Sequence, residues 1–463
     1  MHRRWTKLTS VVSLALIVAS CSAGATPPPA PPPSAQPPPG TATAMPATAT
    51  VQAVAEPAKV AAVKLARLSE AVMWNETFYN EAEQKLVEQF EGTHPGISLT
   101  LGATHENWPH QYLADNAQPP DIIGDTFNTF LAIKRGLILD ISDIWQDPDL
   151  AKAYPADFKA LGEWDGKQYY MPVFISWTAV YYNKELFARY GLQPSQTWAE
   201  FLAVSDTLLA RGVTPIALGL AYGSGAPADM RSATVWIDYL DLRLNGPEFH
   251  TKLVQGAQRY DDAGVRKVFE AWKALSAKNY FSKNAASMRM PDSLNEVLAG
   301  KAAMVLADST DIGRLPAQDQ AKLDFFPFPV MDTAVPLGEV GMPCGYVIPA
   351  RSQHPEEAMA FLHYAASLEG QTAVMQRVAP NVGILPVNRQ VDTANLSDNT
   401  KRGLALVQKA DHFGIPYIST WVTAGDYLNT GFATFSKFSR DPDKNLESTL
   451  TDLEKFRQRA FKK

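Results

Sequence analysis

Residues 71–101 read AVMWNETFYNEAEQKLVEQFEGTHPGISLTL, and the order of patterns within them indicates the fold class. The apolar start, Ala71–Trp74, is typical of a short buried strand. Asn80–Phe90 has apolar residues at helical spacing and is followed by a glycine and a proline, which predicts a helix. Alternation over Ile97–Leu101 predicts a second strand. A strand, a helix and a strand in this order predict a parallel sheet and an α/β fold.

Further elements follow downstream. Asp121–Ile123 is typical of a short strand, and Phe130–Gly136 of a helix that ends in glycine. Thr197 and Glu200 form the pattern of a capping box, which predicts a helix that runs to about Arg211. A later helix is expected near residue 355, where a proline precedes two acidic residues. Its expected apolar face consists of Ala358, Phe361, Leu362 and Ala365.

The N-terminus, residues 1–20, has the features of a secretory signal peptide. Three basic residues, Arg3, Arg4 and Lys7, precede an apolar run that is shorter than the roughly 20 residues of a membrane-spanning helix. The run ends in the letters VASC, which resemble a bacterial lipobox. In a lipobox the cysteine, here Cys21, becomes the new N-terminus and carries lipid. Ordinary signal cleavage with an incidental cysteine is the alternative.

A tether is expected over residues 21–68, because this stretch is mostly proline, alanine, threonine and serine and cannot bury enough apolar surface to fold. The rest of the 463-residue chain is long enough for two domains or lobes. A net charge of −6 and the lack of a Lys/Arg run argue against nucleic acid as a partner. If Cys21 is acylated, Cys344 has no partner for an intramolecular disulfide.

Six stretches, in order, resemble the family of extracellular solute-binding proteins for sugars, which includes maltose-binding protein. They are VMWNETFYNEAEQKLVEQFEGTHPGISL (72–99), PPDIIGDTFNTFLAIKRGLILDIS (119–142), DGKQYYMPVFISWTAVYYNKELFARYGL (165–192), TWAEFLAVSDTLLARGVTPIAL (197–218), LNEVLAGKAAMVLADST (294–310) and GYVIPARSQHPEEAMAFLHYAASLEGQ (345–371). The resemblance covers nearly the whole chain after the tether, and the third and fourth stretches carry its most specific pattern.

The resemblance implies a two-lobed α/β fold with a hinge and a ligand cleft between the lobes. It implies chain crossings near Met171–Phe174, Leu323–Pro329 and Pro349–Ser352. Lobe 1 is therefore expected at 69–172 plus 324–352, and lobe 2 at 173–323 plus 353–463. Ligands of open α/β sheets lie at the carboxyl ends of strands, and hinged lobes can close on them.

Aromatic rings cover the apolar faces of sugars, while carboxylates and amides bind the hydroxyl groups. By family position or by place at a strand end or loop, nine residues are expected to bind substrate: Trp74, Glu76, Asp125, Asn128, Trp177, Tyr222, Trp236, Asp308 and Trp421. Several also have an ordinary structural interpretation. Glu76, Asp125 and Asn128 can cap helices, and Trp236 lies on an expected helix where it can equally be core. The family often has an aromatic beside Asp308, and its absence here puts one stacking surface in doubt.

Patterns of the common hydrolases and metal sites are absent. The only Gly-Ser-Gly, at residues 223–225, lacks the Gly-x-Ser-x-Gly spacing. His105 and His110 are five residues apart, which is not the spacing of a helical zinc site. Acidic residues are plentiful, so a glycosidase pair is not excluded by sequence, but no motif supports one. We therefore expect no catalytic role, cofactor or metal.

The expected function is that of a lipid-anchored, extracytoplasmic binding protein of an ABC-type carbohydrate importer. It would act as a monomer, capture a sugar or oligosaccharide by lobe closure and deliver it to the transmembrane permease subunits, with the membrane contacted through the anchor. Two alternatives stay open. One is a sensor subunit, and the other is a binder of a non-sugar solute such as a polyamine, for which Glu76, Asp125 and Asp308 could supply acidic groups around a cation.

Overall fold

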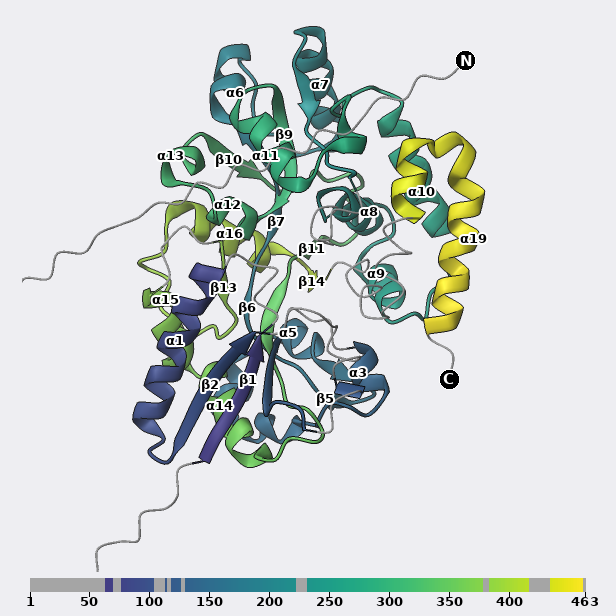
Figure 1. Cartoon of the computed structure of the whole chain (residues 1–463). Helices are drawn as coiled ribbons and strands as arrows, with labels where there is room; N and C mark the ends of the chain where they lie inside the picture. The colour runs from purple at the N-terminus through teal and green to yellow at the C-terminus, as the bar shows by residue number, and fades with distance from the viewer. Residues whose placement is uncertain are drawn as a thin grey trace, which may run out of the picture. The chain divides into compact units, whose positions relative to one another are not determined.

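The chain divides into two units, Met1–Lys59 and Val60–Lys463, and the described residues all lie in the second. The computed structural model describes residues 63–69, 76–103, 113–114, 118–125, 130–221, 231–377, 383–415 and 434–460 (Figure 1). The expected signal peptide, Cys21 and nearly all of the expected tether lie outside these residues. Within the described part, no helix is long and apolar enough to cross a membrane.

A six-stranded sheet forms the first half, in the order β13-β6-β12-β3-β1-β2. Its strands are β1 (Val63–Ser69), β2 (Ile97–Ala103), β3 (Ile122–Asp125), β6 (Met171–Ile175), β12 (Pro343–Val347) and β13 (Leu385–Pro386). β1 runs parallel to β2 and to β3, whereas β12 is antiparallel to β3 and β6. The parallel strand–helix–strand unit expected from the sequence is confirmed, with α1 (Glu76–Thr93) between β1 and β2.

The first described strand, β1, lies earlier in the chain than the strand expected from the sequence. β1 covers Val63–Ser69 and so begins inside the expected tether, whereas Ala71–Trp74 lies outside the described residues. The pairing partner of β1 is 34 residues away, since Val63 faces Ile97, so nothing local to the strand reveals this pairing. Leu65 is fully buried in the core. The last residues of the expected tether, from residue 63 on, are therefore part of a strand.

Helices surround this sheet. They are α1, α3 (Phe130–Lys134), α4 (Pro148–Ala153), α5 (Ala156–Ala160), α14 (Pro355–Ala366) and α15 (Leu368–Arg377), with the 3-10 turn η2 (Ser142–Gln146) and the hairpin of β4 (Glu163–Trp164) and β5 (Lys167–Gln168). The structure confirms α14 and its apolar face, because Ala358, Phe361, Leu362 and Ala365 are all fully buried.

A four-stranded sheet, β10-β7-β9-β8, forms the second half. The strands are β7 (Thr178–Asn183), β8 (Thr214–Ile216), β9 (Ala302–Asp308) and β10 (Leu323–Phe326). The helical elements that follow or precede them along the chain are α6 (Lys184–Tyr190), α7 (Trp198–Ala210), α8 (Arg231–Leu244), α9 (Pro247–Val254), α10 (Ala263–Ser276), η4 (Ala285–Ser287), α11 (Met290–Leu298), α12 (Ser309–Gly313), α13 (Ala317–Gln320), α16 (Asp398–Lys409) and α19 (Pro442–Ala460). The capping box at Thr197 and Glu200 is present and starts α7 as expected.

The chain passes between the two sheets at other places than expected. The first change of sheet is at Ser176–Trp177, between β6 and β7, because the expected crossing at Met171–Phe174 is strand β6 itself. β10 still pairs with β7, so the return does not occur at Leu323–Pro329. It occurs near Gly341–Met342, just before β12 enters the first sheet.

A third difference concerns the segment after residue 352, which was expected in lobe 2. α14 and α15 pack against α1 (Figure 1). The ring of Phe361 lies 5.3 Å from that of Phe90 in an edge-to-face contact. Apolar burial against α1 therefore keeps this segment with the first sheet. The division of the chain into lobes as a whole stays a prediction.

A small parallel sheet joins β11 (Gly338–Val340) to β14 (His412–Gly414). β11 contacts α8 of the second half, while β14 contacts both α5 of the first half and α9 of the second.

Candidate binding site

The hydroxyl of Ser176 lies where the two halves meet and joins three segments of chain. Its Oγ donates to Oδ2 of Asp308 at 2.5 Å and accepts from the backbone N–H of Met342 at 2.9 Å. The backbone N–H of Ser176 in turn donates to the carbonyl of Met342 at 3.0 Å. One small side chain therefore links the β6–β7 crossing, the end of β9 and the start of β12. Ser176, Asp308 and Met342 are called the crossing cluster below.

Asp308 ends β9 and caps the short helix that follows it. Its Oδ1 accepts from the backbone N–H of Thr310 at 2.9 Å and from the Thr310 hydroxyl at 2.5 Å. The side chain is buried. Since each bond to a carboxylate is charge-assisted, this geometry holds the end of the second sheet to the crossing. The structure thus gives Asp308 the role of a helix cap, and its contact with a ligand stays a prediction.

Ser309 makes a second link beside the first. Its Oγ accepts from the N–H of Trp177 at 3.0 Å and donates to the carbonyl of Gly383 at 2.6 Å, just before β13. Gly383 has a φ of +83°, and a Cβ built there would lie 2.2 Å from the carbonyl oxygen of Ser309. Only glycine fits this close approach. The site therefore joins four chain segments through two serine hydroxyls and one carboxylate.

Two of the nine expected site residues, Trp177 and Asp308, are brought close together at this site. The Trp177 ring, however, is buried and packs on Gly403, where an added Cβ would meet it at 2.4 Å, and its centroid lies 6.1 Å from that of Phe325. Burial raises the pKa of the neighbouring Tyr181 well above its usual range, and the negative charge of Asp308 adds to this effect. The ring of Trp177 thus lies in the apolar core, while its backbone N–H and carbonyl form hydrogen bonds with Ser309.

Trp236 lies away from this site, in the core of the second half. Its side chain is 1% exposed, and its ring packs edge-on against Trp272, Phe281 and Phe328. Of the two interpretations open at the sequence level, this placement favours the core. Helical spacing alone had not distinguished them, because a stripe that faces a core and one that faces a cleft have the same period.

Asp125 is the last residue of β3, and Glu76 is the first of α1. In the parallel pairs of the first sheet, Ser69 faces Ala103 of β2 and Gly124 of β3. The carboxyl ends of three strands thus lie side by side, where ligands of open α/β sheets bind. The other expected contacts, Trp74, Asn128, Tyr222 and Trp421, lie outside the described residues.

Sequence reasoning missed Ser176 and Ser309 as members of the site, whereas Met342 lies in a glycine-rich stretch, 341–345, that resembles a family loop expected to approach ligand. Each of the two serines bonds to a residue far away in the chain, such as Asp308, which is 132 positions from Ser176. No motif marks such a bond in advance. The only signal for Ser176 was its place just before the matched YYNK segment.

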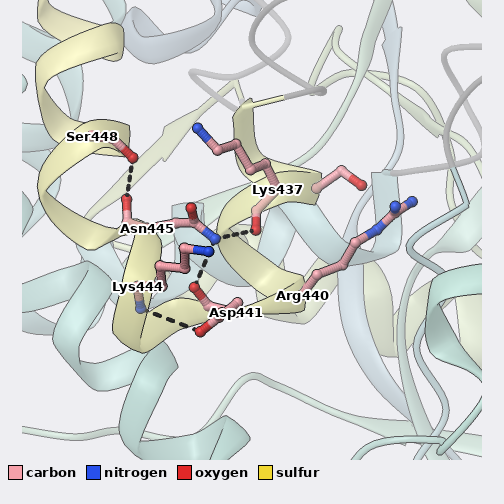
Figure 2. A pocket seen from close by; sticks show the side chains of 7 residues that line it. Lys437, Arg440, Asp441, Lys444, Asn445 and Ser448 are labelled. Atoms are coloured by element: carbon pink, nitrogen blue, oxygen red, sulfur yellow. Dashed lines mark hydrogen bonds between the residues drawn. The ribbon is translucent and has the colours of Figure 1, made fainter.

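A surface pocket at the start of α19 is lined by Ser436, Lys437, Arg440, Asp441, Lys444, Asn445 and Ser448 (Figure 2). Several polar groups of this lining bond to one another. Asn445 Nδ2 donates to the carbonyls of Lys437 and Asp441 at 3.0 and 2.9 Å, and the Lys444 N–H donates to Asp441 Oδ1 at 3.2 Å. These bonds form the turn that begins α19, so the polar groups of this pocket serve the start of a helix.

A smaller pocket of about 110 Å³ lies between α5, with the hairpin after it, and α9. Its lining includes Asp157, Trp164, His250, His412 and Phe413. No group of three or more residues able to hold a metal ion occurs among the described residues.

A family model described as bacterial extracellular solute-binding protein matches residues 78–372. The chain belongs to this family. A related solute-binding protein of Pyrococcus horikoshii, named as an uncharacterised ABC transporter extracellular-binding protein, is 25% identical over 311 residues, which are 64% of this chain and 67% of that protein. An osmoprotective compounds-binding protein of Synechocystis sp. is 23% identical over 251 residues, covering 52% of this chain and 58% of the relative. The chain thus spans at most about two thirds of these two relatives.

Solved solute-binding proteins have the same architecture. The bacterial solute receptor AcbH, described by its preference for β-D-galactopyranose, has a TM-score of 0.72 and 20% identity, over 86% of this chain and 98% of that one. A chitin oligosaccharide binding protein has a TM-score of 0.68 and 22% identity, over 86% and 99%. The fold of this solute-binding protein is therefore the two-lobed α/β fold of the family.

Proposed function

We propose that this protein is the lipid-anchored binding component of an ABC-type carbohydrate importer. It acts outside the cytoplasm as a monomer, captures a sugar or oligosaccharide between its halves and delivers it to the permease subunits. The family match over residues 78–372 is the observation that carries the solute-binding role. Because both sheets direct strand ends toward the chain crossings, at Asp125 and Asp308, the crossing cluster is the proposed floor of the binding site.

The carbohydrate class rests on the two structural relatives named for a galactopyranose and for a chitin oligosaccharide. Glu76, Asp125 and Asp308 would bind hydroxyl groups as charged acceptors, and Asn128 would bind them through its amide. Trp74, Tyr222 and Trp421 would cover the apolar faces of the sugar. Trp177 and Trp236 would support the site from the core, since both rings are buried. Ligand would favour closure only through tighter binding to the closed arrangement.

A small osmoprotective solute is the second candidate. The Synechocystis relative carries that name and matches 52% of this chain. Direct binding measurements separate the two candidates.

Thermal unfolding of the full chain against a panel of solutes tests the proposal. The panel holds mono- and oligosaccharides, osmoprotectants, polyamines and amino acids. A bound solute at ~100 times its Kd stabilises the folded state by about 2.7 kcal/mol, so the midpoint should rise with a carbohydrate. A rise only with osmoprotectants or polyamines would keep the binding role and reject the carbohydrate. No rise with any solute would count against the proposal.

The lipid anchor gives a separate prediction. Acyl chains bind membranes by about 0.8 kcal/mol per buried CH₂ group, so a lipidated Cys21 should hold the protein in the membrane fraction. Replacing Cys21 with serine should move it to the soluble fraction, as measured by cell fractionation. Membrane association that persists in the variant would contradict lipidation at this residue.

A further inference from the structure

His250 is buried in the second half, and both of its ring nitrogens face acceptors. Nδ1 lies 3.2 Å from Oδ2 of Asp241 on α8, and Nε2 lies 2.9 Å from the carbonyl oxygen of Ile415, the residue that follows β14. A neutral imidazole has one N–H, whereas an imidazolium has two. Only the protonated ring can therefore donate to the carboxylate and to the carbonyl at the same time.

β14 also contacts the first half. The backbone N–H of Phe413 donates to Asp157 on α5 at 3.0 Å, and the Phe413 ring lies 5.2 Å from that of Phe158 in an edge-to-face contact. The Gly414 carbonyl accepts from the N–H of Gly341 at 3.3 Å, one residue before Met342 of the crossing cluster. His250 thus holds one end of a strand that pairs with β11, contacts α9 of the second half, and also contacts the first half and the chain crossing.

The small pocket lies beside this strand. α5 and the hairpin after it line one side of the pocket, and α9 lines the other. β14 is also part of the lining. The two sides are thus incompletely packed against each other there, and β14 is the segment that contacts both. A change in the position of β14 therefore changes how the halves meet.

We propose that protonated His250 is a positioning residue for β14 and, through β14, for the contact between the two halves. The arrangement of the halves then depends on pH. That this alters solute affinity is the part that rests on the proposed function.

The charged surroundings of the ring support protonation. Burial disfavours the charged form and is the largest effect, but the hydrogen bond and charge of Asp241, the charge of Asp238 and the Ile415 carbonyl together raise the pKa of His250 above its usual 6.5. The stabilisation is complete below about pH 6.5 and is lost as the pH rises through the folded-state pKa.

Other titratable groups line the same place. His412 on β14 lies 3.5 Å from Asp157 on α5, and Glu163 of the hairpin after α5 lines the pocket. A hydrogen bond from His412, the largest effect, keeps the pKa of Asp157 below its usual value. His412 is thus the second histidine that a pH experiment has to separate from His250.

The test uses the ligand-free full chain, so its outcome does not depend on finding the solute. Amide hydrogen exchange at Phe413 and Gly414, corrected for the intrinsic rate, is measured from about pH 5.5 to about pH 8.5, the range of histidine titration. Small-angle scattering follows the radius of gyration at both ends of the range. Protection in the unmodified protein should fall as the pH rises, by at most about tenfold for each unit of pKa shift, and the radius of gyration should change with it.

Asp241→Asn is the decisive variant, because an asparagine amide can donate to neutral Nδ1 while Nε2–H still donates to Ile415. It should keep the protection and remove its pH dependence. His412→Gln should retain the pH dependence, and His250→Gln should lower protection at every pH. A pH-independent profile in the unmodified protein, the same slope in Asp241→Asn, loss of the slope in His412→Gln, or a radius of gyration that does not follow the exchange would overturn the proposal.

Discussion

Replacing Arg243 with methionine should destabilise the protein by about 3–5 kcal/mol, the usual cost of leaving a buried charge without its partner. Arg243 Nη2 donates to Glu339 at 2.6 Å and to the Phe328 carbonyl at 3.0 Å, and Nη1 donates to the Gly338 carbonyl. Both side chains of the ion pair are almost fully buried. Methionine fills similar volume but leaves the carboxylate and two carbonyls without these donors.

Arg266→Met is the matched control. Arg266 binds Glu447 through two bonds of 2.6 and 2.9 Å, but both side chains are exposed. Exposed pairs contribute about 0–1 kcal/mol, so the two variants should differ severalfold in their loss. Urea unfolding measures both. Equal losses would show that the buried pair at Arg243 has no special role in stability.

The loss in Arg243→Met should also depend on pH. Burial raises the pKa of Glu339, against the opposing effect of Arg243, so removing the arginine should raise it further. A carboxyl group with a raised folded-state pKa binds more protons when folded, and the free energy of unfolding then increases as the pH falls. The difference between the variant and the unmodified protein should therefore narrow toward acid pH.

Local patterns predicted elements well, and non-local pairing explains the errors. The capping box at Thr197 needs only neighbours three residues apart, and it is present as expected. β1 needs β2, more than thirty residues away, so its own residues do not reveal the pairing. The third expected crossing failed for the same reason, because only packing on α1 shows that α14 stays with the first sheet.

The candidate site was predictable in kind but only partly in its members. Asp308 was expected from its place after an apolar strand, and it does lie at a junction of the two halves. Apart from its place before the YYNK segment, nothing in the sequence marks Ser176, since a serine acquires this role only when two distant segments meet it. Aromatic residues posed the opposite difficulty, because Trp236 satisfies every requirement for a stacking residue except exposure.

Asp308→Ala should cost about 2–4 kcal/mol, because it removes a helix cap and a charge-assisted bond to a buried hydroxyl. Ser176→Ala should cost about 1–3 kcal/mol, since the Met342 N–H loses its acceptor and the carboxylate loses a donor. If the two side chains act through their 2.5 Å bond, the double variant should lose less than the sum of the single ones, by about 0.5–3 kcal/mol.

Asp308→Asn separates the structural role from ligand binding. Its amide oxygen can still accept from Thr310, and its NH₂ can donate to Ser176 Oγ, so much of the stability should remain. If Asp308 also binds a sugar hydroxyl as a charged acceptor, the affinity for the solute found in the thermal panel should fall in this variant more than in Ser176→Ala. Calorimetric titration of both variants decides this. Equal affinities would make the carboxylate a purely structural member of the crossing cluster and would leave Glu76 and Asp125 as the acidic ligands.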